Sequence, residues 1–143
     1  MLRTKILLVD DETEFTDSMS YLLGARGYQV TAVNSGSDAL KALKEGKYDV
    51  MVLDLKMPGK DGMTVLREAK ELDIFTETLI LTGHGTIDTA KEAMKLGAYD
   101  YLTKPCEIDD LVAKIQGARI KKDTTEKEEI LKKIDGIVEG KSF

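Results

Sequence analysis

The chain has 143 residues, enough for one domain with its own hydrophobic core, and its single cysteine, Cys106, excludes an internal disulfide and a cysteine metal cluster. Apolar residues make up 42 % of it and charged residues 33 %, the balance of a soluble globular protein, and no apolar run approaches the ~20 residues that span a bilayer. The net charge of −5 argues against a basic nucleic-acid-binding face, and the single cysteine favours a reducing cytosol. We therefore expect a cytoplasmic protein that binds neither membrane nor nucleic acid directly.

Apolar runs of strand length alternate with amphipathic helical patterns five times along the chain. The predicted strands are residues 5–9, 28–33, 49–53, 78–82 and 99–103, and the predicted helices are residues 13–25, 36–45, 62–72, 86–96 and 108–120. Strict alternation with short connections predicts an α/β fold, a parallel sheet with helices on both faces.

The strands differ in pattern. The first, third and fourth are nearly all apolar, as central strands covered on both faces should be. The second and fifth alternate apolar with polar residues, as edge strands can. This distribution favours a doubly wound, five-stranded sheet with the flavodoxin-like order 2-1-3-4-5.

Polar residues end four of these strands. Asp10 and Asp11 follow the first strand and Asp54 the third, while Thr82 ends the fourth and Lys104 follows the fifth. In an open α/β sheet, ligands bind beyond the carboxyl ends of the strands, where the strand order reverses. We therefore expect these side chains to gather on one edge of the sheet.

Neighbouring carboxylates repel each other unless a cation joins them. A hard divalent ion, Mg²⁺ or Mn²⁺, with oxygen ligands would relieve the repulsion between Asp10, Asp11 and Asp54. The ammonium of Lys104 and the hydroxyl of Thr82 would suit the oxygens of a phosphoryl group, and a carboxylate at the centre can act as a nucleophile that forms an aspartyl phosphate.

Simpler interpretations of the same residues stay open. Asp10 and Asp11 could cap the first helix, Asp54 could be a turn residue, and Lys104 could be a solvated lysine at the sheet edge. His84 is the only histidine and is interpreted as an exposed loop residue, which argues against a histidine phosphocarrier.

Four segments, "ILLVDDE", "DVMVLDLKMPGKDG", "LILTGHG" and "GAYDYLTKP", occur in this order within about residues 4–118. In sequence and spacing they resemble the signature blocks of the receiver domain of two-component response regulators. The last two are most similar to receivers that precede ATPase-driven transcription activators.

The resemblance implies a role for each matching position. Asp54 would accept a phosphoryl group, and Asp10, Asp11, Asp54 and the backbone carbonyl of Lys56 would hold Mg²⁺ or Mn²⁺. Thr82 and Lys104 would contact the phosphoryl group.

Three further features of the family also have counterparts here. Thr82 and Tyr101 would switch conformation together, Lys104–Pro105 would be a cis peptide, and Lys56 and His84 would tune the lifetime of the phosphorylated state.

The implied mechanism is a signalling switch. A histidine kinase or phosphotransfer protein would supply the phosphoryl group, and the face formed by the fourth helix, fifth strand and fifth helix would change to control an output domain or target protein. Because the protein would modify and restore only itself, we do not expect an enzyme.

Residues 120–143 are predicted to be an amphipathic helical tail of a receiver domain at 1–119. Thr124 or Thr125 would cap a last helix with Glu128 in a capping box. An apolar stripe runs along this segment, at Ile130, Leu131, Ile134, Ile137 and Val138. The tail either packs back on the domain, extends the preceding helix into solvent, or forms a homodimer, and it is too short for an output domain.

Two other classes of function compete. A phosphatase of the haloacid-dehalogenase type also forms an aspartyl phosphate with Mg²⁺, but it needs a "D-x-D" pair after the first strand, and residue 12 is Glu12. A flavodoxin-like FMN carrier would need a hydroxyl- and glycine-rich phosphate loop there, where three acids would repel the phosphate.

Overall fold

The computed structural model describes residues 3–140, with side chains described for residues 3–137. The strands are β1 (Lys5–Val9), β2 (Gln29–Val33), β3 (Val50–Leu53), β4 (Glu77–Thr82) and β5 (Asp100–Thr103). The helices are α1 (Thr13–Ala25), α2 (Gly36–Glu45), α3 (Gly62–Lys70), α4 (Ile87–Lys95) and α5 (Ile108–Gly140). Every predicted element is present, with bounds within two residues of the prediction except at the end of α5. None of the described helices is long and apolar enough to cross a membrane.

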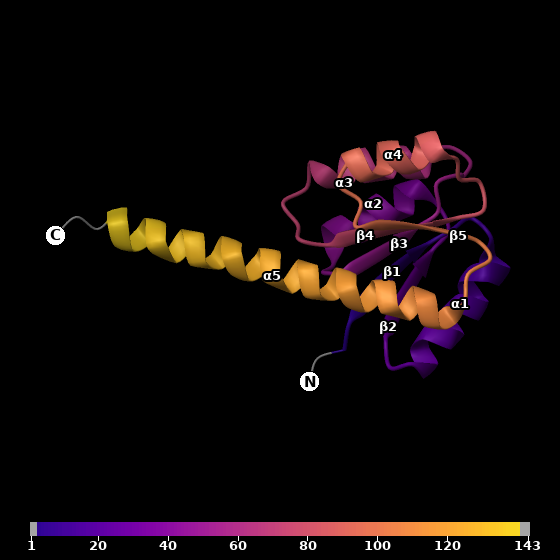
Figure 1. Ribbon diagram of the computed structural model, residues 1–143, viewed down its shortest axis with the longest axis horizontal. Coiled ribbons are helices and arrows are strands. Elements are labelled where there is room, and N and C mark those ends of the chain that lie inside the picture. Colours follow the sequence, from indigo (N-terminus) through magenta and orange to yellow (C-terminus); the bar gives the residue numbers. More distant parts are fainter. Residues whose placement is uncertain (1–2, 141–143) are drawn as a thin grey trace.

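The five strands form one parallel sheet in the order β2-β1-β3-β4-β5 (Figure 1). The predicted order is therefore confirmed. The central strands β1, β3 and β4 are buried along nearly their whole length, whereas the edge strands β2 and β5 are only partly buried. The difference in apolar pattern between the two kinds of strand reflects this position.

Helices cover both faces of the sheet, as predicted, and a separate apolar core lies under each layer. Strand residues on one face pack with α2, α3 and α4, among them Leu7, Val9, Met51, Leu53 and Ile80. Strand residues on the other face pack with α1 and α5, among them Ile6, Leu8, Val52, Leu79 and Leu81. Alternate residues of each strand thus point to opposite layers.

The sheet register brings the predicted site residues to the carboxyl-terminal end of the strands. Val9 pairs with Leu53, so Asp10 and Asp54 are the next residues along adjacent strands. The Asp54 amide donates to the Val9 carbonyl at 3.0 Å, which continues the ladder to the acidic residues. Beyond the neighbouring strand pair β4–β5, the Lys104 amide donates to the Thr82 carbonyl at 2.9 Å.

Helix α5 runs without a break for 33 residues and projects far from the domain (Figure 1). The predicted cap at Thr124 or Thr125 is wrong: the Thr124 hydroxyl instead donates to the Ile120 carbonyl at 2.9 Å, inside the helix. A threonine hydroxyl can satisfy either a helix start or the carbonyl four residues before it, so the local pattern was ambiguous. Among the described residues the tail extends the preceding helix rather than packing back on the domain, and the homodimer stays a prediction.

The boundary predicted after residue 119 falls inside α5, and the division of the chain into 1–119 and 120–143 stays a prediction. Residues 1–2 and 141–143 of these segments, and the side chain of Val138, lie outside the described part.

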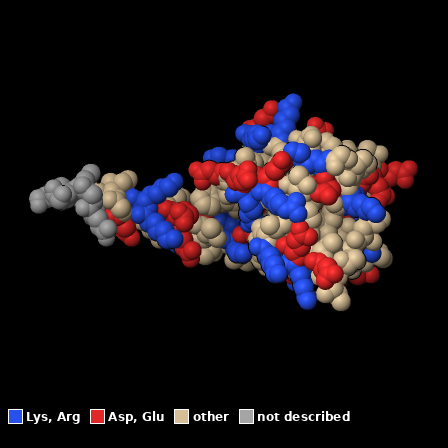
Figure 2. All heavy atoms as spheres, turned by 90° about the horizontal axis from the view of Figure 1, so that it is seen from above, with Lys and Arg blue, Asp and Glu red and all other residues tan. Residues whose placement is uncertain are grey.

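On the projecting helix and on the face of the domain shown in Figure 2, Lys and Arg are interspersed with Asp and Glu. The ion pair between Lys122 and Glu126, at 2.7 Å, has the helical spacing of four residues.

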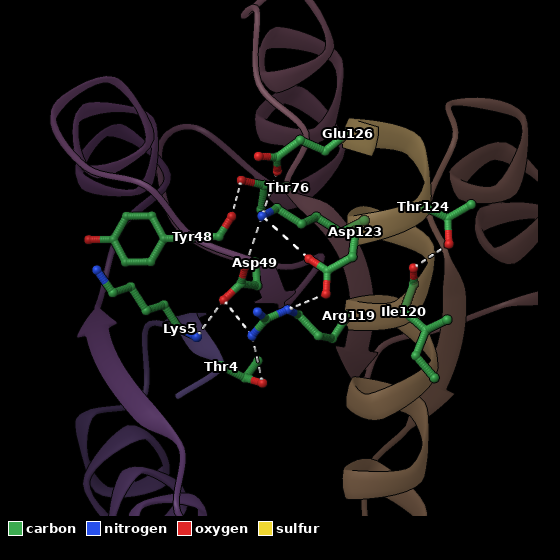
Figure 3. A network of polar contacts seen from close by, with 11 residues as sticks. Thr4, Lys5, Tyr48, Asp49, Thr76, Arg119, Ile120, Asp123, Thr124 and Glu126 are labelled. Atoms are coloured by element: carbon green, nitrogen blue, oxygen red, sulfur yellow. Dashed lines mark hydrogen bonds and ion pairs between the residues drawn. The ribbon is translucent and has the colours of Figure 1, made fainter. Parts of the chain in front are cut away.

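Asp49, at the start of β3, ties α5 to the sheet (Figure 3). Its carboxylate accepts the backbone N–H of Lys5 at 2.8 Å and the Arg119 guanidinium at 3.1 Å, and it pairs with the Lys122 ammonium at 3.0 Å. Arg119 also donates to the Thr4 hydroxyl at 3.1 Å. A carboxylate as buried as Asp49 is costly unless it is paired, and these contacts satisfy it from strand β1 and helix α5.

Candidate functional site

Asp10 is buried at the end of β1, and its carboxylate is fully engaged. Only 1 % of the residue is exposed. Its Oδ1 accepts the backbone N–H of Glu12 at 2.9 Å, and the Asn34 amide donates to its carbonyl oxygen at 2.8 Å and to the Thr16 hydroxyl at 3.1 Å. Glu12 occupies the N-cap position of α1, and no side chain caps that helix. The alternative that Asp10 or Asp11 caps α1 is therefore wrong.

Asp10, Asp11 and Glu12 form an acidic group with the donor set of a hard cation. Each offers a carboxylate oxygen, and these oxygens lie within 4.8 Å of one another. Asp11 and Glu12 are exposed, so an ion could keep water ligands, as Mg²⁺ does. The sequence analysis did not assign Glu12 to the metal site, although its place in the "DDE" run was a signal for it.

Asp54 immediately follows β3, in register with Asp10 at the end of the adjacent strand β1, and it is not one of the three residues of the acidic group. It is 3 % exposed, and its Oδ1 is a buried oxygen with no hydrogen-bond partner in the described part of the chain. A buried carboxylate oxygen without a partner is costly, so its position fits a group that receives a cation or a phosphoryl. A turn role would use the carboxylate in local hydrogen bonds, and Oδ1 makes none.

The loop after Asp54 is held close to it. Gly62, the last residue of "KMPGKDG", begins α3, and its N–H donates to the Leu55 carbonyl at 2.9 Å. A Cβ at position 62 would overlap the carbonyl oxygen of Asp54, so only glycine fits there. Lys56 is exposed on the same loop.

Asp61 caps α3, the helix that this loop leads into. Its carboxylate accepts the Thr64 N–H at 2.9 Å. The Thr64 N–H, and then the Thr64 side chain, hold the pKa of Asp61 below its usual value, with Arg67 adding a smaller effect. The cap therefore keeps its charge across the neutral and mildly acidic range, and it fixes the end of the loop that carries Lys56.

Lys104 reaches the acidic group from the end of β5. Its ammonium forms an ion pair with Asp10 Oδ2 and lies 3.9 Å from the centroid of the Phe15 ring. Its side chain is only 18 % exposed, so it is not a solvated edge lysine. No ion pair joins Lys104 to Asp54 among the described residues. The Lys104–Pro105 peptide bond is cis, as the resemblance implied.

Thr82 and Tyr101 lie on the side of the sheet that faces α4. Thr82 is fully buried, and its hydroxyl accepts the backbone N–H of His84 at 3.2 Å. Tyr101 packs partly buried against the core of that side, and its hydroxyl lies 3.2 Å from Thr89 Oγ1 in α4. His84 is exposed, as predicted. The sequence analysis missed Thr89, because nothing in its local pattern relates it to a residue of β5.

A cavity of about 660 Å³ lies at the opposite, amino-terminal edge of the sheet. Tyr48, Phe75, Arg119 and Lys122 are among the residues that line it. None of the predicted site residues does. In an open α/β sheet the ligand site lies at the carboxyl ends of the strands, so the acidic group and not this cavity is the candidate site.

Comparison with known proteins agrees with this geometry. The family model described as "response regulator receiver domain" matches residues 6–116. The chain is 41 % identical over 113 residues to the transcriptional regulatory protein FixJ of Bradyrhizobium diazoefficiens, covering 79 % of this chain and 55 % of FixJ. It is 39 % identical over 113 residues to the transcriptional regulatory protein ZraR of Escherichia coli, covering 79 % of this chain but only 26 % of ZraR.

Solved structures are similar over most of the chain. A response regulator receiver domain protein from Clostridium thermocellum has a TM-score of 0.80 and 38 % identity, covering 85 % of this chain and 98 % of that one. A response regulator protein from Burkholderia pseudomallei, solved with a phosphorylated aspartic acid, a calcium ion and citrate, has a TM-score of 0.75 and 29 % identity. That match covers 90 % of this chain and 74 % of the other.

Proposed function

This chain belongs to the response regulator receiver domain family of two-component systems, and from that premise we propose that Asp54 is its phosphoacceptor. The observation that carries the proposal is the buried Asp54 Oδ1, which has no hydrogen-bond partner among the described residues; Asp54 follows β3, and Asp10 follows the adjacent strand β1. The similar protein from Burkholderia pseudomallei carries a phosphorylated aspartic acid, which supports the same chemistry here.

The donor is a histidine kinase or a phosphotransfer protein. An oxygen of Asp54 attacks the phosphorus of the donor's phosphohistidine, the P–N bond breaks, and the imidazole leaves with the electron pair and takes up a proton. The product is an acyl phosphate on Asp54. Lys104 neutralises charge on the phosphoryl oxygens during the transfer.

Mg²⁺ or Mn²⁺ is the cation that the acidic group suits. Asp10, Asp11, Asp54 and the Lys56 carbonyl would hold it, with Glu12 as a further carboxylate nearby. When bound, the ion supplies positive charge that offsets repulsion between the carboxylates and the incoming phosphoryl group.

Phosphorylation acts on Thr82 and Tyr101. The Thr82 hydroxyl moves to the phosphoryl group and leaves its contact with the His84 N–H, and Tyr101 follows and gives up its contact with Thr89. The face formed by α4, β5 and α5 then changes, which is a shift between two states driven by a local change of charge. Lys56 and His84, both exposed beside the site, tune the rate of hydrolysis.

The changed face controls an output domain or a target protein in the cytoplasm. The chain spans about half of FixJ and a quarter of ZraR. Both relatives are named as transcriptional regulatory proteins, which is consistent with the resemblance to receivers of transcription activators. The protein phosphorylates and dephosphorylates itself only, and does not turn over a substrate as an enzyme does.

The projecting part of α5 is a candidate homodimer contact. Ile130, Leu131, Ile134 and Ile137 are each about half exposed on it at helical spacing. Light scattering at high concentration would test this with Ile130→Lys/Ile134→Lys against the intact chain, with Lys133→Gln as the control. A dimer that only the isoleucine variant abolishes supports the contact, and identical masses for all three proteins reject it.

Incubation with acetyl phosphate and Mg²⁺ tests the proposed function. We expect the protein to gain one acid-labile phosphoryl group, measured by intact mass, and Asp54→Asn to gain none. Asp73→Asn, which changes an exposed aspartate at the other edge of the sheet, is the matched control and should be phosphorylated normally. Unaltered phosphorylation of Asp54→Asn would place the acceptor elsewhere, and rapid hydrolysis of many different phosphate esters would indicate a phosphatase.

A further inference from the structure

Lys104 has two partners among the described residues, and only one of them is charged. Its ammonium pairs with Asp10 Oδ2 and also lies 3.9 Å from the centroid of the Phe15 ring. Phe15 is in the first turn of α1 and packs, partly buried, against the core between the sheet, α1 and α5. The ring is therefore held by the fold, whereas the lysine side chain is long and intrinsically flexible.

The two partners differ in what a bound cation does to them. A divalent ion bound by the acidic group attracts the Asp10 carboxylate, and this weakens the attraction between that carboxylate and the Lys104 ammonium. An aromatic ring cannot ligate Mg²⁺, so the face of Phe15 keeps its attraction for the ammonium when the ion binds. Phe15 would then become the principal partner of Lys104 at the moment when a phosphoryl group arrives.

We propose that Phe15 is a positioning residue that holds the Lys104 ammonium beside Asp54 for phosphoryl transfer. This inference rests on the proposed function, because it assigns Phe15 a part in the same reaction. Phe15 does not touch the reacting atoms, and it acts only through Lys104.

Kinetics with acetyl phosphate and saturating Mg²⁺ test the proposal. Phe15→Leu keeps an apolar side chain but removes the ring, and should slow phosphorylation of Asp54 by about threefold to tenfold. Phe15→Tyr keeps the ring and should react within about twofold of the unmodified protein. In a Lys104→Gln background, Phe15→Leu should cause no further slowing, because the group it positions is gone.

Nuclear magnetic resonance gives a second measurement that needs neither metal nor phosphoryl donor. The ε-methylene protons of Lys104 should show an upfield ring-current shift that is retained in Phe15→Tyr and lost in Phe15→Leu. A structural role for Phe15 alone would slow the reaction equally with Lys104 or Gln at position 104, and that result would overturn the proposal.

The remaining outcomes separate this inference from the proposed function. Normal phosphorylation of both the wild-type protein and Phe15→Leu would overturn the positioning role and leave Asp54 as the phosphoacceptor. Absence of a ring-current shift on Lys104 would also overturn it. Failure of the wild-type protein to gain any phosphoryl group would overturn the proposed function and this inference together.

Discussion

Tyr101 of β5 lies directly against Gly85 in the loop between β4 and α4. A Cβ at position 85 would overlap the hydroxyl oxygen of Tyr101, so the tyrosine occupies its present position only because residue 85 is glycine. From there the hydroxyl reaches Thr89 Oγ1 at 3.2 Å. Thr89 also completes the capping box of α4 with Thr86, so the tyrosine is linked to the start of that helix.

Gly85→Ala should therefore displace Tyr101. The methyl group forces the ring away and breaks the contact with Thr89, and we expect a loss of about 1–2 kcal/mol in the free energy of unfolding. Urea denaturation gives the stability, and a nuclear Overhauser contact between Tyr101 and α4 reports the ring. Gly83→Ala is the control, since a Cβ there would meet only Lys104 Cβ, at 3.9 Å. An unmoved ring in Gly85→Ala would contradict the prediction.

Lys104→Gln should raise the affinity for Mg²⁺. The Lys104 ammonium pairs with Asp10, so its removal leaves a buried carboxylate without its positive partner, and a bound Mg²⁺ can take that place. We expect tighter Mg²⁺ binding on the order of tenfold, and a metal-free protein less stable by about 3 kcal/mol. Calorimetric titration and thermal denaturation with and without Mg²⁺ measure the two effects.

Lys60→Gln provides the matched control for that experiment. Lys60 pairs with Glu68, away from the acidic group, so the affinity for Mg²⁺ should stay as in the unmodified protein. Equal Mg²⁺ affinity in all three proteins would show that Lys104 does not compete with the ion for Asp10.

Asp49→Ala should loosen α5 from the sheet. The substitution leaves the Lys5 N–H without its acceptor and removes a carboxylate partner from Arg119 and Lys122, and should lower the free energy of unfolding by about 2–4 kcal/mol. Faster amide exchange near Lys122 should accompany it. Asp123→Ala removes an exposed partner of Arg119 and should cost less than about 1 kcal/mol. Similar losses in the two variants, measured in urea, would argue against the role given to Asp49.

Asp61→Ala should lower stability in a pH-dependent way. Hydrogen bonding from Thr64 lowers the pKa of Asp61 in the folded protein below its usual 3.8. The stabilisation is therefore fully present above that value and is lost as the pH falls through the lowered folded pKa. At pH 7 we expect a loss of about 1 kcal/mol, the usual contribution of a helix cap.

Urea denaturation between pH 7 and about pH 3 would measure this difference. The gap between Asp61→Ala and the unmodified protein should shrink at the acidic end. Asp61→Asn keeps a side-chain acceptor and should stay close to the unmodified protein at pH 7. A gap that does not change with pH would mean that the carboxylate charge contributes nothing.

Sequence patterns predicted those features that depend on periodicity. The pattern of apolar residues in a strand indicates whether it is covered on one face or on both, and this distinguished β2 and β5 from the central strands. The polar residues at the strand ends reached one edge because all parallel strands present their carboxyl ends there. The end of α5 was less predictable, since Thr124 suits the interior of a helix as well as its start.

The sequence by itself favoured the strand order 2-1-3-4-5 and placed Asp10, Asp54 and Lys104 at the carboxyl end of the sheet, because hydrophobic periodicity reports which strands are buried on both faces and parallel strands all end on the same side. Only the tertiary structure decided that Lys104 pairs with Asp10 and stacks on Phe15, and that Asp49 holds Arg119 and Lys122. These contacts join residues far apart in the chain. Which partner a side chain takes depends on distances set by the packing of whole elements, and no local pattern records those distances.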